Sequence, residues 1–349
     1  MAARVQAEPL RAFASSVFVR AGLTPEDAQT VADVLVWANL RGVDSHGVLR
    51  IPVYLDYMSS GHMKTRPDIR VLRETLAIIS VDADCALGPV VTVKVMRQVI
   101  EKAKNVGIGW GLVRNLTHQG ALGYYAELAA GMGMVGIVNV CGTPVMAPSG
   151  AKAAGVHNSP LAIGVPADKH RPLLLDMAHS VAAGGRIKHA QDSELLIPSG
   201  WALDRNGNPT TDPAQAGILL PLGGPKGSGL AMIFECLSSV MAGNPLLSLA
   251  IPRMLAGEGR YHVQNGIVAA IDIGAFTDPD VFRTNVDALI SAEKSLPRAD
   301  PHAEILVPGE RGYRTYDERA ANGVPLPPGT IDKLHEVAQT MGVPFPDNA

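Results

Sequence analysis

The spacing of apolar residues changes along the chain, from helical near the N-terminus to strand-like in the middle. Residues 24–27, Thr-Pro-Glu-Asp, have the composition of a helix start, with a hydroxyl N-cap, a proline in the first turn and acids near the positive end of the helix dipole. The helical spacing continues to about Leu40, and Pro52 fits the first turn of a following helix that runs through Met58. The N-terminal part is therefore predicted to be helical.

After Asp68 the pattern predicts strands and helices in alternation. The predicted strands or hairpins cover 69–81, 108–113, 134–140, 161–166, 172–176, 266–273 and 303–307. The predicted helices cover 90–104, 121–130, 230–241, 280–294 and 330–341. Asn206-Gly207 is typical of a hairpin turn. Together these patterns indicate an α/β (α+β) chain.

Gly131-Met-Gly-Met-Val-Gly136 matches the glycine spacing of a dinucleotide-binding fingerprint, but its neighbours are in the wrong order. Such a fingerprint follows a strand and opens a helix, so that a phosphate meets the helix N-terminus. Here the helical pattern precedes the glycines and the strand pattern follows them. No acidic residue lies about twenty positions further on to bind a ribose. The glycines are therefore interpreted as the end of a helix.

Length and charge narrow the class of protein. At 349 residues, the chain is long enough for two or more domains. The formal net charge is -3 and there is no basic run, so neither nucleic acid nor an anionic membrane surface is expected as a partner. The first residues contain no apolar signal core, and no apolar run is long enough to cross a bilayer. These features predict a cytoplasmic protein.

Neither a disulfide framework nor a metal site is indicated. Cys85, Cys141 and Cys236 are odd in number and have no CxxC spacing, so burial as small apolar residues is the default expectation. The histidines form no HxH or HExxH pattern.

The richest chemistry lies between Arg41 and Arg50, where an acid, a hydroxyl, an imidazole and two guanidinium groups surround two glycines. His46 can exchange a proton near neutral pH, and the neighbouring Ser45 hydroxyl or Asp44 carboxylate can hold its tautomer. The planar fork of Arg50 matches a substrate carboxylate. An ordinary turn explains the same composition, because Asp, Ser and Gly are common turn residues, and Arg41 is expected to cap the preceding helix.

A glycine-rich loop at 223–229 carries Lys226 and precedes an apolar helical pattern. Backbone N–H groups and a lysine at a helix N-terminus favour an anion such as a phosphate. The GxxxxGK[ST] order of a Walker A loop is absent, and a plain loop-to-helix connection explains the segment equally well.

Several motifs, in order from about residue 10 to 320, resemble the malate/L-lactate dehydrogenase family. They are Arg41-x-x-Asp44-Ser45-His46-Gly47-x-x-Arg50, Thr117-His118-x-Gly120, Asp176-Met177-Ala178, Pro209-Thr-Thr-Asp-Pro, Leu222-Gly-Gly-x-Lys226-Gly-x-Gly229-Leu-Ala and Pro308-Gly309-Glu310. The resemblance implies a homodimer with NADH or NADPH as cofactor. It also implies a non-Rossmann nicotinamide-binding domain with a mixed, largely antiparallel sheet, plus a mainly helical domain. The boundaries we expect are 1–66 (helical domain, first segment), 67–215 (sheet domain), 216–300 (helical domain, second segment) and 301–349 (return to the sheet domain and C-terminal helix).

The resemblance also implies roles for individual residues. His46 matches the proton donor or acceptor, Arg50 the carboxylate clamp, and His118 a second acid/base or substrate-orienting residue, although His118 also fits a capping or core position. Ser45 matches a partner of His46, and Asp192 is the candidate for a third member of that relay. The positions that match cofactor contacts are Asp176, Met177, Ala178, Lys226, Gly227, Pro308, Gly309 and Glu310. Ser228 departs from the family, in which this position is often aromatic.

These observations predict hydride transfer between a nicotinamide and C2 of a small 2-oxo or 2-hydroxy carboxylic acid. The cofactor supplies only a hydride, so a residue such as His46 has to supply the proton. A reductase of 2-imino acids is the alternative, because the same clamp and proton donor serve a C=N bond. A serine hydrolase is disfavoured, since there is no GxSxG elbow and Ser45 is adjacent to His46. A non-catalytic binding module would leave the 41–50 cluster without a purpose.

Overall fold

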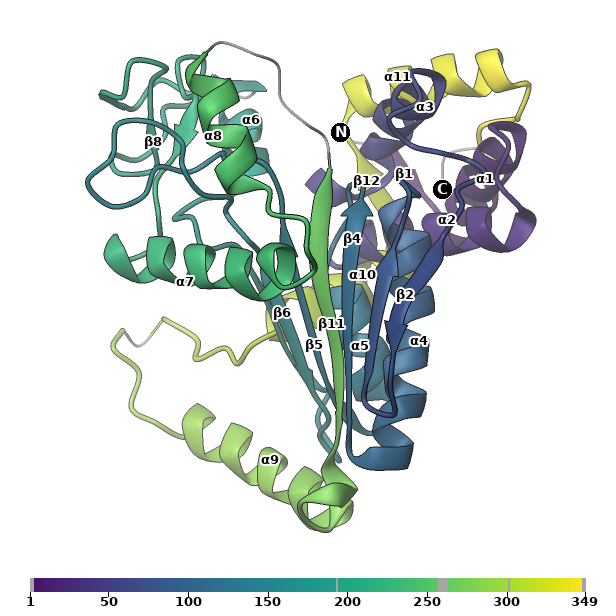
Figure 1. Cartoon of the computed structure of the whole chain (residues 1–349), viewed down its shortest axis with the longest axis vertical. Helices are drawn as coiled ribbons and strands as arrows, with labels where there is room; N and C mark the ends of the chain where they lie inside the picture. The colour runs from purple at the N-terminus through teal and green to yellow at the C-terminus, as the bar shows by residue number, and fades with distance from the viewer. Residues whose placement is uncertain (1–2, 193, 257–262, 301, 347–349) are drawn as a thin grey trace.

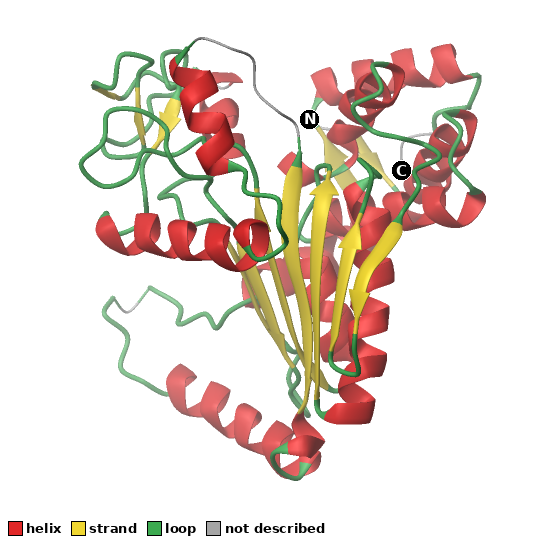
Figure 2. Cartoon of the chain, in the orientation of Figure 1, coloured by secondary structure: helices red, strands yellow, loops and turns green. Residues whose placement is uncertain are grey.

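A seven-stranded sheet forms the centre of the computed structural model, which describes residues 3–192, 194–256, 263–300 and 302–346 (Figure 1, Figure 2). In spatial order its strands are β2 (Arg70–Glu74), β3 (Ile78–Asp82), β4 (Ile108–Leu116), β11 (Gln264–Asp272), β5 (Met134–Cys141), β6 (Leu161–Val165) and β7 (Leu173–Met177). β3 and β4 are parallel, and the other neighbouring strands are antiparallel. The sheet is therefore mixed and largely antiparallel, as expected.

Two helices, α4 (Gly88–Val106) and α5 (Gly123–Gly131), cover one face of this sheet and share its apolar core (Figure 1). Small residues on the strands allow the helices to approach closely. A Cβ atom added to Gly109 on β4 would lie 1.9 Å from the backbone oxygen of Val99 on α4. Val99 is itself completely buried in the core. The packing distance between helix and sheet therefore depends on the absence of a side chain at position 109.

A helical layer lies at one end of the sheet and combines both ends of the chain (Figure 1). Its elements are α1 (Ala7–Arg20), α2 (Pro25–Leu40), α3 (Ile51–Ser59), α11 (Pro328–Met341) and the paired strands β1 (Ala3–Val5) and β12 (Val324–Leu326). These elements enclose a second apolar core. Thr24 caps α2 by accepting a hydrogen bond from the Asp27 N–H group (3.1 Å), which confirms the predicted helix start.

The other face of the sheet is covered by the segment between β7 and β11, drawn in teal and green in Figure 1. Its elements are α6 (Gly184–Asp192), the small sheet of β8 (Ala202–Leu203), β9 (Pro209–Thr210) and β10 (Ile218–Leu219), α7 (Pro225–Glu235) with a π-helical turn (Cys236–Val240), and α8 (Leu247–Leu255). α7 and the π-helical turn contact the central strands. α9 (Pro279–Lys294) follows β11 and extends beyond its end, and α10 (Glu310–Asn322) packs against α2.

Two turn predictions are confirmed. Helix α5 ends at Gly131, Gly133 has a left-handed φ of 77°, and β5 begins at Met134, so the GxGxxG-like segment connects a helix to a strand. Gly207 has a φ of 82° between the paired strands β8 and β9, as the Asn206-Gly207 dipeptide predicts.

The predicted strand at 303–307 is wrong. This segment pairs with none of the described strands, because its polar backbone groups are bound by side chains. The Ile305 carbonyl accepts a hydrogen bond from Lys294 Nζ (3.3 Å), and the Val307 N–H donates to Glu310 (3.2 Å). The segment is thereby fixed as the lead into α10.

The domain boundaries themselves stay a prediction, but the positions of three elements differ from it. The range 216–300, expected in the helical domain, contains β11, which lies at the centre of the large sheet. This apolar strand lies at the centre of the sheet because it pairs with β4 on one side and with β5 on the other. In the range 301–349, β12 and α11 pack in the N-terminal helical layer and not on the sheet.

The close approach at Gly109 predicts a large difference between two Gly→Ala variants. Gly109→Ala should lower the free energy of unfolding by about 1–3 kcal/mol, because the added methyl group has to displace the α4 backbone. Gly131→Ala is the matched control, since nothing lies within 4 Å of a Cβ atom at that position. Urea unfolding of the two variants and the wild type measures the effect. Equal stability of all the proteins would contradict this packing.

Candidate active site

The turn between α2 and α3 is fixed by a buried asparagine. Asn39 Oδ1 accepts the Val48 N–H (2.8 Å), and Asn39 Nδ2 donates to Asp44 Oδ1 (2.7 Å). Arg319 of α10 donates to both oxygens of Asp44, at 2.7 and 3.1 Å. A Cβ atom at Gly47 would lie 2.1 Å from Asn39 Oδ1, so the turn requires glycine there. Asp44 therefore orders the turn.

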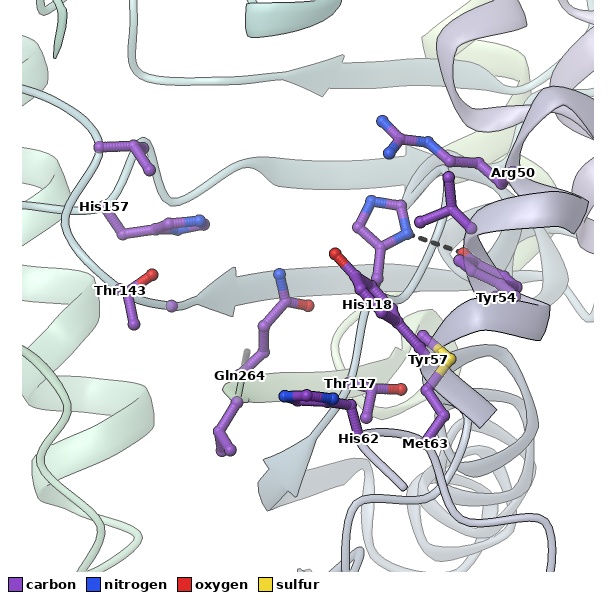
Figure 3. A pocket seen from close by; sticks show the side chains of 14 residues that line it. Arg50, Tyr54, Tyr57, His62, Met63, Thr117, His118, Thr143, His157 and Gln264 are labelled. Atoms are coloured by element: carbon purple, nitrogen blue, oxygen red, sulfur yellow. Dashed lines mark hydrogen bonds between the residues drawn. The ribbon is translucent and has the colours of Figure 1, made fainter. Parts of the chain in front are cut away.

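This turn brings Ser45, His46 and Arg50 together with His118. Ser45 Oγ lies 2.9 Å from His46 Nδ1, and Arg50 Nε donates to the Ser45 carbonyl (2.7 Å). The rings of His46 and His118 are stacked, with centroids 5.4 Å apart and 22° between their planes. On its other side, His118 Nδ1 lies 2.7 Å from the hydroxyl of Tyr54 (Figure 3).

A cavity of about 200 Å³ opens beside Arg50, Tyr54 and His118 (Figure 3). Arg50 and His118 line one side, and Thr143, His157 and Gln264 line the other. Among the described residues that line it, Arg50 is the only side chain with a permanent charge. The cavity is therefore suited to a small molecule with one anionic group near Arg50.

The histidines of the site are held in the neutral form. Burial, reinforced by the positive charge of Arg50, lowers the pKa of His46 to about 4. The same causes, with a smaller contribution from His46, lower the pKa of His118 well below its ordinary value. Burial also lowers the pKa of His157 to about 4. At neutral pH each ring can therefore accept a hydrogen bond at one nitrogen and donate one from the other without carrying charge.

The first group of predicted cofactor residues lies at the open edge of the sheet. Asp176 is on β7, and its Oδ2 accepts the N–H of Gly123 at the start of α5 (2.8 Å). The Leu174 N–H donates to the Pro308 carbonyl (3.1 Å), so β7 and the start of α10 are adjacent. Met177 ends β7, and Ala178 follows it. The predicted positions 176–178 and 308–309 are thus brought to one edge.

Arg41 connects α2 to the same region. Its Nη2 donates to the Gly309 carbonyl (3.2 Å), and its guanidinium lies 3.7 Å from the ring centroid of Tyr313. The expected capping of α2 by this side chain is replaced by a contact between α2 and α10. The Glu310 carboxylate is occupied by Lys294 Nζ, at 2.7 Å from both oxygens, so its contact with a cofactor stays a prediction.

The second group of predicted cofactor residues begins α7. Lys226 is exposed in the first turn of this helix. A Cβ atom at Gly227 would lie 2.5 Å from the His179 carbonyl oxygen, so the loop after β7 packs directly on the helix start. Ser228, at the position that departs from the family pattern, is buried and donates to the Gly224 carbonyl (3.3 Å). Its hydroxyl therefore supports the first turn of α7.

Asp192 is the last residue of α6, and its side chain lies outside the part of the chain that the structure describes. The other end of α6 approaches the site, because a Cβ atom at Gly185 would lie 2.7 Å from Ser45 Cβ. The role of Asp192 in a relay with His46 stays a prediction.

Three cavity residues were not identified from the sequence. Tyr54 had a detectable signal, since it follows Arg50 by four residues and Tyr57 continues the same helix face. His157 and Gln264 had no local sequence signal for a place in the cavity. Their positions depend on long-range packing.

Within the described residues, no cluster of His, Cys, Asp or Glu has metal-binding geometry. None of the described helices is long and apolar enough to cross a membrane.

Known proteins resemble this chain over nearly its whole length, in sequence and in structure. Residues 5–335 match the malate/L-lactate dehydrogenase family. A malate dehydrogenase of Pyrococcus horikoshii is 36% identical, over 97% of this chain and 96% of the relative. The solved malate dehydrogenase of Entamoeba histolytica has a TM-score of 0.93 at 29% identity and covers 99% of this chain and 100% of its own. Δ1-Piperideine-2-carboxylate reductase of Pseudomonas syringae has a TM-score of 0.83 at 28% identity, with coverage of 96% and 99%.

The low pKa of His157 predicts a pH-dependent stability. An unfolded histidine has a pKa near 6.5, whereas burial lowers the pKa of folded His157 to about 4. Between these values the unfolded state binds more protons, so stability is lost as the pH falls from 6.5 to 4. His157→Gln should reduce this slope by roughly 1 kcal/mol per pH unit. Urea unfolding across this range measures the slope, with exposed His170→Gln as control. An unchanged slope in His157→Gln would contradict the neutral buried ring.

Proposed function

Because the chain belongs to the malate/L-lactate dehydrogenase family, we propose that it transfers a hydride between a nicotinamide cofactor and C2 of a small 2-oxo or 2-hydroxy carboxylic acid. The observation that carries this proposal is the stacked pair of His46 and His118 beside Arg50, the one permanent charge among the described cavity residues. A carboxylate on Arg50 would place the neighbouring C2 atom beside the two stacked imidazole rings.

Substrate binding and proton transfer are coupled through Arg50. Its positive charge contributes to the low pKa of His46. A bound carboxylate neutralises that charge, so it raises the pKa of His46 and helps the ring hold the proton that C2 oxygen needs during reduction. In the oxidative direction, neutral His46 accepts the hydroxyl proton. Ser45, at 2.9 Å from Nδ1, keeps the ring oriented in both directions.

The residues at the open sheet edge and at the start of α7 fit a nicotinamide dinucleotide. The exposed Lys226 in the first turn of α7 and the positive end of the helix dipole suit a pyrophosphate. Within the described residues, buried His179 Nδ1 has no hydrogen-bond partner, which suits a polar cofactor group. When bound, this cofactor supplies the hydride. The site is non-Rossmann, which the helix-to-strand order at Gly131–Gly136 supports.

A reductase of 2-imino acids is the second candidate. It is favoured by the likeness of the whole chain to the solved Δ1-piperideine-2-carboxylate reductase. The proposed residues serve both substrates, because a protonated His46 can donate to nitrogen as well as to oxygen and Arg50 binds the same carboxylate.

We also propose that the active form is a cytoplasmic homodimer. One face of α7 and its π-helical turn presents apolar side chains at helical spacing, each at least 38% exposed in the single chain: Leu230, Ile233, Leu237, Val240 and Met241. A continuous apolar face of this kind is typical of an interface between subunits.

Nicotinamide oxidation tests the proposed reaction. Purified protein should oxidise NADH or NADPH with a panel of 2-oxo acids. His46→Ala should lower kcat by ~100- to 10,000-fold because the proton donor is lost. Arg50→Ala should raise KM roughly 10- to 100-fold, and Arg50→Lys, which keeps the charge without the fork, should lie between. Turnover only with piperideine-2-carboxylate, or with an oxo acid plus methylamine, would favour the imine reductase. Absence of both turnover and cofactor binding would contradict the proposal.

The apolar α7 face predicts the oligomeric state. Light scattering coupled to size exclusion should give twice the mass of the chain. Ile233→Glu should shift the protein toward the monomer, because a charge replaces apolar contact area at the centre of the face. Val71→Glu, on the exposed edge strand β2, is the control and should leave the mass unchanged. A monomeric wild type would contradict the proposed dimer.

A further inference from the structure

Tyr54 contacts His118, and this contact takes no part in the proton transfer that we propose for His46. Its side chain is 1% exposed, and its hydroxyl oxygen lies 2.7 Å from His118 Nδ1 (Figure 3). Tyr54 comes from α3, whereas His118 follows β4. The contact therefore connects the helical layer to the sheet at the edge of the cavity.

A second donor decides the direction of this hydrogen bond. The backbone N–H of Gly120 points at the same His118 Nδ1 atom, at 3.3 Å. A backbone N–H can only donate, so Nδ1 has to be the unprotonated, accepting nitrogen. The Tyr54 hydroxyl then donates to it as well. A neutral imidazole with an accepting Nδ1 carries its hydrogen on Nε2.

The surroundings of His118 keep the ring neutral. The groups that face it are Arg50, His46, His157 and Tyr54. The Arg50 cation opposes a second positive charge nearby, and burial opposes any charge on the ring. Burial also raises the pKa of Tyr54 far above the neutral range, so its hydroxyl keeps its proton and remains a donor.

We propose that Tyr54 is a positioning residue that, together with the Gly120 N–H, fixes His118 as the neutral Nε2–H tautomer. His118 then presents a permanent N–H donor to the C2 oxygen or nitrogen of the substrate and stays neutral throughout the reaction. This inference rests on the proposed function and divides the work of the two stacked rings. His46 moves the proton, because the Ser45 hydroxyl at its Nδ1 can donate or accept and permits either tautomer. His118 polarises the C2 bond, because its tautomer is fixed by a donor that cannot reverse.

The tautomer can be measured without turnover. In protein labelled with ¹⁵N-histidine, the His118 signals, assigned by their loss in His118→Gln, should show protonated Nε2 and unprotonated Nδ1 between about pH 5.5 and 8. Tyr54→Phe should increase the Nδ1–H population, because one of the two donors to Nδ1 is removed. Tyr57→Phe, which removes another hydroxyl that lines the cavity from the same helix, should leave the His118 shifts in place. A wild-type His118 with protonated Nδ1, or one that titrates in this range, would overturn the proposal.

Kinetics separate a neutral donor from an acid or base. His118→Gln should lower kcat ~100- to 1000-fold, because a preorganised donor to the developing charge is lost. The shape of its pH–rate profile should match that of the wild type, since the lost group does not titrate. Tyr54→Phe should lower kcat roughly two- to tenfold, the effect of one hydrogen bond, with little change in KM. Loss of a pH limb in His118→Gln would make His118 the acid or base and overturn the proposal. If the NMR signals show the Nε2–H tautomer of His118 but the protein reduces no oxo acid and no imine, the proposed function is wrong and the tautomer assignment still holds.

Discussion

The carboxamide of Asn39 is the interaction on which the site depends. Buried at the end of α2, it accepts from the backbone of Val48 and donates to Asp44, so it connects the two short 3₁₀ helices, Asp44–His46 and Val48–Arg50, that form the turn. Gly47 leaves the space that the carboxamide occupies. Because Ser45 and His46 lie inside this closed turn and Arg50 leaves it into α3, their relative positions follow from one buried side chain. Arg319 adds a salt bridge from α10, which ties the turn to the C-terminal part of the chain.

Burial and a single cation together set the chemistry of the cavity. An imidazole in water would be partly protonated near neutral pH, whereas the burial of His46 and its neighbourhood to Arg50 favour the neutral ring. His46 is therefore neutral in the free site, and we propose that it gains a proton once an anion binds Arg50. His118 lies near the same positive charge of Arg50, but its Nδ1 accepts hydrogen bonds from the Gly120 N–H and the Tyr54 hydroxyl. We therefore expect this ring to stay neutral when an anion binds. We propose that these two stacked histidines have distinct roles because different groups contact their Nδ1 atoms.

Local features of the sequence predicted the parts of the molecule that local forces determine. The cap at Thr24, the helix end near Gly133 and the turn at Gly207 depend on residues a few positions apart, and each is found as expected. Spacing also placed Ser45, His46 and Arg50 in one turn. The strand expected at 303–307 is not found, because side chains at positions 294 and 310 bind backbone groups of this segment that a strand would use for pairing.

Features that depend on distant packing could not be predicted in the same way. His157 and Gln264 come from separate loops and strands and meet only when the large sheet forms with β11 at its centre. The Arg41 side chain was expected at its own helix terminus, but the carbonyl of Gly309 and the ring of Tyr313 offer a buried alternative from α10.

The most direct test of the site is a crystal structure of the protein with NADH and oxamate, an unreactive analogue of a small 2-oxo acid. The carboxylate should be bound by the guanidinium of Arg50, and the neighbouring carbonyl oxygen should lie within hydrogen-bond distance of His46 and of His118 Nε2. The nicotinamide ring should face the same carbon from the side of α7. Oxamate bound away from Arg50, or a nicotinamide ring remote from the two histidines, would contradict the assignment of this cavity as the active site.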